Sequence, residues 1–186
     1  MKKLLLVCLL AVLGWHQADA QTSKNPGEVF IQQAAFEHND AVKRFTSDFT
    51  TMFNLDFDAL NESGNESNTA IVNQFGDGNS SSITQNGWGN KALVNLLGDF
   101  NSTGLIQSGS DNQFILNLEG DNNSILGEQR GSENTLRLDL TGSLKNQTFS
   151  QRGSNLTFEL VDNGNGGVPL QIEQRGQGAT VRVENH

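Results

Sequence analysis

Acidic side chains recur through the second half of the sequence and are the first candidates for metal binding or acid–base catalysis. They include Asp77, Asp99, Asp111, Asp121 and Glu133. Calcium-binding solenoids use a nine-residue unit with several glycines, whereas the unit here has eleven residues and only one position that is always glycine. Catalytic carboxylates cluster in one pocket, but these acids are scattered over the turns of the repeat. We therefore predict solvated charges and no enzyme activity.

Histidine and cysteine offer no better candidates for chemistry. His38 and His186 are isolated and lack the spacing of metal ligands, so we predict neither a metal nor a cofactor. Cys8 is the only cysteine and lies within the first 20 residues, which we expect to be removed on export. The secreted chain would then have no disulfide and no thiolate.

Side-chain amides have the most regular spacing of all polar groups, and the chemistry that this spacing favours is stacking. Asparagine opens seven consecutive eleven-residue units without slippage, and position seven of the units alternates between glutamine and leucine. Identical amides that stack in register bond to the amide above and the amide below. We predict that the following residues point inward and form ladders: Asn68, Asn79, Asn90, Asn101, Asn112, Asn123, Asn134, Gln85, Gln107, Gln129, Gln151, Gln174, Leu96, Leu118 and Leu140.

An alternating apolar pattern defines the elements that position these amides. Positions three and five of the unit are apolar in 18 of 22 sites, whereas positions two, four and six are apolar in 6 of 33. Alternation with period two predicts a strand of about six residues with one buried face. Glycine at position nine permits a turn after each strand. These glycines are Gly76, Gly87, Gly98, Gly109, Gly120, Gly131, Gly142, Gly153, Gly164 and Gly176.

The alternation of glutamine and leucine indicates that two facing strands form one coil of 22 residues, so the predicted fold is an all-β solenoid. One coil buries about four apolar side chains, worth roughly 1.5–3 kcal/mol each. Ordering the backbone costs about 1–2 kcal/mol per residue, so a coil is stable only when it stacks on others. The end coils expose unpaired backbone groups, which favours addition of further chains. We therefore expect a cross-β homopolymer.

The first 67 residues differ from the repeats. Residues 1–20 combine two lysines, a short apolar run and the Ala18-Asp19-Ala20 site, which is typical of a secretory signal peptide cleaved after Ala20. No apolar run reaches the roughly 20 residues of a membrane span. Residues 21–67 are predicted to be a non-repeat leader, part helical because Phe45, Phe49, Phe53 and Phe57 share a helical spacing. The leader caps the first coil, serves as a secretion address, or does both.

The charge of the chain excludes one class of partner. The net charge is −9, and removal of Lys2, Lys3 and Asp19 with the signal peptide leaves 10 basic and 20 acidic residues, a net charge of −10. Binding to nucleic acid or anionic lipid needs clustered Lys or Arg to neutralise phosphates. We therefore predict no nucleic-acid partner.

The repeat resembles that of the curlins, the subunits of bacterial curli fibres. The resemblance covers residues 68–186 and rests on stretches such as "NSTGLIQSGSDNQFILNL" and "NSILGEQRGSENTLRLDL". It implies a β-solenoid subunit of amyloid fibres outside a Gram-negative cell, with roles in biofilm matrix and adhesion. It also implies an outer-membrane secretion pore, periplasmic accessory proteins and a second curlin subunit as partners.

Two features depart from the curlin pattern. Leucine at position seven of alternate strands stands where the family has glutamine, and the leader is longer than the family's secretion segment. The last coil, with Arg175 and Arg182, resembles the nucleating subunit, whereas the earlier coils resemble the major subunit equally well. The alternative from another class is a monomeric secreted solenoid adhesin that binds a surface glycan.

Overall fold

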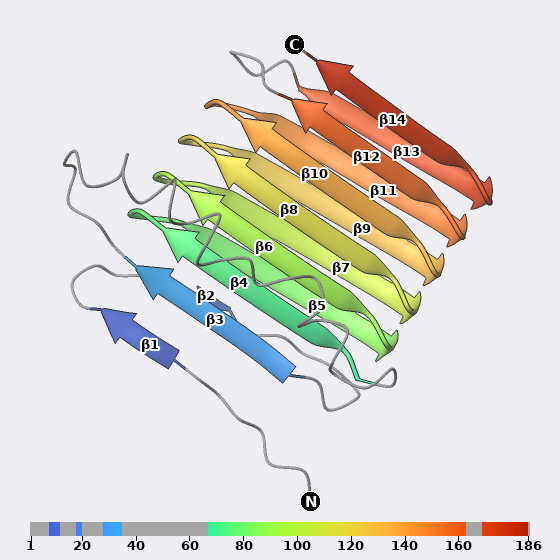
Figure 1. The fold of residues 1–186 in the computed structure, drawn as a ribbon, viewed down its shortest axis with the longest axis horizontal. Helices are drawn as coiled ribbons and strands as arrows, with labels where there is room; N and C mark the ends of the chain where they lie inside the picture. Colours follow the sequence, from blue (N-terminus) through green and yellow to red (C-terminus); the bar gives the residue numbers. More distant parts are fainter. Residues whose placement is uncertain (1–7, 12–17, 20–27, 35–66, 163–168, 186) are drawn as a thin grey trace, which may run out of the picture.

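A computed structural model describes residues 8–11, 18–19, 28–34, 67–162 and 169–185. Within these ranges every regular element is a β-strand, and none of the described residues forms a helix suited to crossing a membrane. Figure 1 shows the strands stacked in two parallel layers along one axis, with the chain rising through the stack in sequence order. The described repeat region is therefore all-β, as the alternating pattern predicts.

The two layers contain alternate strands of the chain. We call the first layer the Leu wall: β4 (Thr69–Phe75), β6 (Lys91–Leu97), β8 (Gln113–Glu119), β10 (Thr135–Thr141), β12 (Thr157–Asp162) and β14 (Thr180–Asn185). We call the second layer the Gln wall: β5 (Ser80–Trp88), β7 (Ser102–Ser110), β9 (Ser124–Ser132), β11 (Asn146–Ser154) and β13 (Leu170–Gln177).

Neighbouring strands within each wall are parallel and in register. Leu116 pairs with Leu138 in the Leu wall, and Gln107 pairs with Gln129 in the Gln wall, so a step along a wall advances the sequence by 22 residues. The last step of each wall advances it by 23. The fold is a β-solenoid of about five turns with 22 residues per coil. This confirms the predicted fold class and coil length.

The core lies between the walls and consists of the inward apolar residues of both. Phe114, Leu116 and Leu138 are fully buried, and the Phe149 and Phe158 rings pack with centroids 5.5 Å apart. Side chains compensate for one another across the core: a Cβ atom at Gly127 would lie only 2.8 Å from Cε2 of Phe114, so this phenylalanine fills the space that the glycine leaves. Packing between walls thus uses residues that differ from coil to coil.

The strands are longer than predicted and differ between the walls. The Leu-wall strand β8 has seven residues, whereas the Gln-wall strand β7 has nine and runs through Gly109. Gly109 has φ +116°, and a Cβ atom there would lie 1.9 Å from the carbonyl oxygen of Gly131 in the next coil. Glycine at position nine is therefore required by the close approach of stacked coils as well as by the turn.

Three short strands extend the sheets at the N-terminal end of the solenoid. β3 (Glu28–Ala34) pairs with β4, β1 (Cys8–Ala11) pairs with β3, and β2 (Ala18–Asp19) pairs with β5, all in parallel. β1 and β2 belong to the segment predicted to be cleaved, so β3 would be the outermost of these strands in the secreted chain. The predicted helical face of Phe45–Phe57 and the turn glycine Gly164 lie outside the described residues.

Candidate assembly site: ladders and the exposed end

The glutamines of the Gln wall form one continuous buried ladder. Each Nε2 donates to the Oε1 of the next coil, at 2.7, 2.8, 2.9 and 2.9 Å from the first pair to the last. Each Nε2 also contacts backbone carbonyls, as Gln107 does with Lys91 and Asn112 at 3.0 and 3.2 Å. The ladder comprises Gln85, Gln107, Gln129, Gln151 and Gln174, all buried.

The asparagines at position one form two further columns at the edges where the walls meet. In one column, Asn112 Nδ2 donates to Asn90 Oδ1 and to the carbonyl of Gly131, both at 2.9 Å. The backbone N–H of Asn112 donates to the same Oδ1 at 3.2 Å. Each asparagine therefore links the strand start to the glycine turn of the adjoining coil. The columns comprise Asn68, Asn90, Asn112 and Asn134, and Asn79, Asn101 and Asn123, all buried.

The arrangement suits stacking because every ladder amide has both a donor and an acceptor role. Gln174, the last amide of the Gln ladder, already donates to the carbonyls of Thr157 and Ala179, so a further stacked glutamine would add the one bond that each interior glutamine makes to the next coil. Chains of hydrogen bonds also polarise one another, which strengthens each bond in a ladder. Such a site performs no covalent chemistry; it selects a strand with the same residues in the same register.

The leucines at position seven form the apolar counterpart in the Leu wall. Leu96, Leu118 and Leu140 are buried in register with one another. The column ends in polar residues that the sequence pattern alone did not single out. Gln74 lies at its N-terminal end and donates to Ser81 Oγ at 2.7 Å, and Asp162 lies at its C-terminal end.

A buried ion pair closes the C-terminal half of the core. Lys145 takes the place of asparagine at position one, Asp162 takes the place of leucine at position seven, and Lys145 Nζ lies 2.8 Å from Asp162 Oδ2. Their side chains are 1% and 9% exposed. The signal that could have found the pair is that both residues break their columns at the same end of the solenoid.

Two more ladders lie outside the core and were also missed. Asn73, Asn95 and Asn117 alternate with the inward residues, yet their amides bond at 2.7 Å from coil to coil. In the turns, the carboxylates of Asp99 and Asp121 each accept the backbone N–H of the corresponding residue one coil earlier, at 2.8 Å. Asp121 is exposed and Asp99 partly exposed, so both carboxylates reach solvent as predicted, and in addition they cap the stacked turns.

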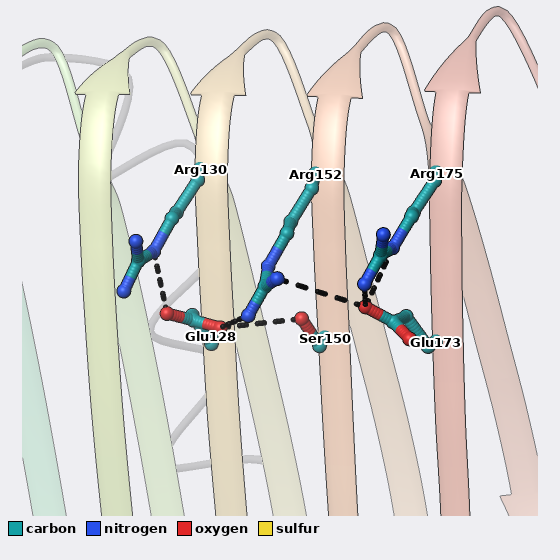
Figure 2. A network of polar contacts seen from close by, with 6 residues as sticks. All are labelled: Glu128, Arg130, Ser150, Arg152, Glu173 and Arg175. Atoms are coloured by element: carbon teal, nitrogen blue, oxygen red, sulfur yellow. Dashed lines mark hydrogen bonds and ion pairs between the residues drawn. The ribbon is translucent and has the colours of Figure 1, made fainter.

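A ladder of ion pairs covers the outer face of the Gln wall near its C-terminal end, as Figure 2 shows. Glu128 accepts from Arg130 at 2.5 Å and from Arg152 at 3.0 Å, and Arg152 also approaches Glu173. Partial burial alone would raise the pKa of Glu128, but the hydrogen bonds from Arg152 and Arg130 outweigh it and lower that pKa. The same contact with Glu128 raises the pKa of Arg152.

The C-terminal end of the solenoid leaves stacking positions open. A Cβ atom at Gly176 would meet nothing within 4 Å, in contrast to 1.8 Å at Gly153. Gln174 keeps its two carbonyl contacts and is the last glutamine of the ladder in the described chain. Pro169 sits just before β13 begins at Leu170 and shortens the edge strand. The exposed edge of β13 therefore resembles an interior strand of the Gln wall without the next strand stacked on it.

The arginines of the last coil are paired with carboxylates on the surface. Arg175 contacts Glu173 at 2.5 Å, and Arg182 contacts Glu184. The end therefore presents balanced charges to an approaching chain. Among the described residues no three His, Cys, Asp or Glu side chains are grouped to hold a metal ion.

Comparison with known proteins gives one match. Residues 66–95, which include β4, β5 and most of β6, match the family model described as the curlin associated repeat. Neither a curated protein nor a solved structure shows significant similarity to the chain. The matched segment is repeated in register through the described solenoid. The chain therefore carries a curlin-type repeat over residues 66–95.

Proposed function

We propose that this protein is a structural subunit of extracellular curli-type amyloid fibres and that it contributes to biofilm matrix and surface adhesion. The observation that carries the proposal is the Gln ladder, which runs through every coil and ends at Gln174 beside the open position at Gly176. Cross-β fibres are built from stacked strands and amide ladders of this kind. The fibre would extend the intramolecular stack with further copies.

The proposal includes a route to the cell surface. Cleavage after Ala20 would release a chain beginning at Gln21, which would leave a Gram-negative cell through an outer-membrane pore with the help of periplasmic accessory proteins. A second curlin subunit would nucleate the fibre or form its bulk. Support for this route comes from the signal-peptide pattern of residues 1–20 and from the match of residues 66–95 to the curlin associated repeat. Sequencing the N-terminus of the secreted chain tests the cleavage site.

Fibre growth from purified secreted protein in quiescent, denaturant-free buffer tests the assembly itself. We expect thioflavin fluorescence to rise after a lag and oriented fibres to diffract at about 4.7–4.8 Å along the fibre axis. A Gly109→Ala chain is the negative control, because its methyl group would strike the Gly131 carbonyl and disrupt the stacking of coils within the chain itself. A chain that stays monomeric for days without fluorescence would contradict the proposal and favour the glycan-binding adhesin.

A further inference from the structure

The number of strands in the solenoid determines how two copies can stack. The described part of the repeat region contains eleven strands, β4 to β14, of which six belong to the Leu wall and five to the Gln wall. The first and last strands of this described solenoid therefore lie on the same wall (Figure 1). If a second copy stacked on β14 without rotation, its β4 would continue the Leu wall, but one strand would be missing from the Gln wall between β13 and the next β5.

A half-turn about the solenoid axis removes this gap. Each eleven-residue unit is half a coil, so a chain of eleven units ends half a coil out of phase with its own beginning. After a half-turn, β4 of the second copy pairs with β13 and β5 pairs with β14, and all strands remain parallel because the two walls run in opposite directions. Head-to-tail interfaces of this kind generate open filaments.

The residues at the two ends match across this rotated junction. Gln74 is the glutamine of a column that otherwise holds Leu96, Leu118 and Leu140. The half-turn moves Gln74 out of register with the leucines and places it next to Gln174, where it continues the Gln ladder. On the other wall Gln85 meets Asn185, which is paired with Asp162 in register and is again an amide residue.

The glycine turns match as well. Interior glycines of the Gln wall approach the next coil so closely that a Cβ atom would lie 1.8–1.9 Å from its carbonyl oxygen, whereas the space at Gly176 is open. In the rotated junction Gly76 of the second copy lies over Gly176 and fills this open space, because Gly76 and Gly176 are both at position nine of their units. We propose that successive copies of this chain stack head to tail with a half-turn, joining β4 to β13 and β5 to β14.

Strand β3 occupies the β4 edge in the single chain and must give way at the junction. Val29, Ile31 and Gln33 of β3 lie in register with Ala70, Val72 and Gln74 of β4. The same spacing of two aliphatic residues and one glutamine occurs in β13 at Leu170, Ile172 and Gln174. In the single chain β3 therefore covers the edge of β4 that the β13 strand of a neighbouring copy covers in the fibre. β3 leaves this edge when the neighbour binds. This step rests on the proposed fibre function.

Paired cysteine substitutions in assembled fibres test the rotation. Stacked partners on adjacent strands have Cα atoms about 4.8 Å apart, within disulfide range. The half-turn predicts intermolecular disulfides for Ile71→Cys with Gln171→Cys and for Ser82→Cys with Arg182→Cys. Stacking without rotation predicts them for Ile71→Cys with Arg182→Cys instead, while Ser82→Cys with Gln171→Cys would span the missing strand. Oxidised fibres are then dissolved in denaturant and read for covalent dimers on a gel.

We expect covalent dimers from the first two variants and none from the other two. Dimers from Ile71→Cys with Arg182→Cys alone, or from no variant in well-formed fibres, would overturn the inference while leaving the fibre function intact. Image reconstruction of unsubstituted fibres measures the rotation and rise between successive copies without any mutation. The half-turn predicts a rotation near 180° and a rise of about 26 Å per copy, whereas unrotated stacking predicts little rotation and about 29 Å. Failure to form any fibre would instead contradict the proposed function.

Discussion

The two walls of the solenoid solve the same stacking problem with different chemistry. The Gln wall holds an unbroken amide ladder from Gln85 to Gln174, whereas the corresponding column of the Leu wall is apolar from Leu96 to Leu140. Leucines gain stability from burial regardless of small shifts in position, but amides require a partner at hydrogen-bond distance. The comparison indicates that the Leu wall contributes cohesion while the Gln wall fixes the register.

The largest effect should be the same on both walls, because both depend on glycine turns. Gly109→Ala and Gly120→Ala each place a methyl group 1.9 and 2.1 Å from the next glycine carbonyl. We expect each to lower the free energy of unfolding by at least about 4 kcal/mol, measured by urea denaturation. Gly176→Ala is the control, since Gly176 has the same φ of +116° as Gly109 but its Cβ would meet nothing within 4 Å. A loss confined to one wall would show that the turns are not equivalent.

The next effect concerns the ion pair that interrupts both kinds of column. Lys145→Met leaves Asp162 buried without its ammonium partner and should cost about 3–5 kcal/mol. The double variant Lys145→Asn with Asp162→Leu extends the Asn and Leu columns by one rung and should regain most of that loss. Thermal unfolding of the single and double variants measures the difference. If the double variant is no more stable than Lys145→Met, then an asparagine and a leucine at these two positions cannot replace the ion pair.

A smaller effect separates inward from outward positions on the Gln wall. Gln107→Ala breaks the ladder and leaves its neighbours Gln85 and Gln129 without one partner each, which should cost about 2 kcal/mol. Ser102→Ala changes an exposed side chain of the same strand and should cost almost nothing. Fibre lag times at matched concentration should follow the same order. Equal lags would mean that the ladder does not govern assembly.

The smallest effect is the pH response of the outer ion-pair ladder. Because the pKa of Glu128 is lowered in the folded chain, its ionised form stabilises the fold above the ordinary glutamate pKa of about 4.3. This contribution is lost as the pH falls through the lowered value. We expect at most about 1 kcal/mol, since the ladder is partly exposed. Glu128→Gln should flatten the acid side of the stability profile relative to the Ser102→Ala chain.

The repeat period was sufficient to predict the coil, the two walls and the inward ladders at positions one and seven. Period and alternation fix the register because a shift by one residue would turn every buried side chain to solvent. The Lys145–Asp162 pair could not be predicted in this way, because the two residues are 17 apart in sequence and meet only across the core. Likewise, the packing of Phe114 into the space at Gly127 depends on which coil each residue occupies.

The turn acids illustrate a second limit of the pattern. The sequence indicates that Asp99 and Asp121 lie in turns, but the bond from each carboxylate to the backbone of the previous coil depends on the turn geometry. The strand lengths differ for the same reason: β7 continues through Gly109, whereas β8 ends one residue before Gly120. The backbone conformation at these glycines depends on their contact with the next coil. The sequence of a single eleven-residue unit does not contain that information.

The direction of the side-chain bonds has an electrostatic consequence for a long stack. In the Gln ladder every Nε2 donates toward the C-terminal end, as Gln107 does to Gln129. In the Asn columns the bonds between side chains run the other way, as from Asn112 to Asn90. Aligned amide dipoles add head to tail, as they do along a helix. Because the two sets oppose each other, the partial charges that they leave at each end of a filament have opposite signs and partly cancel.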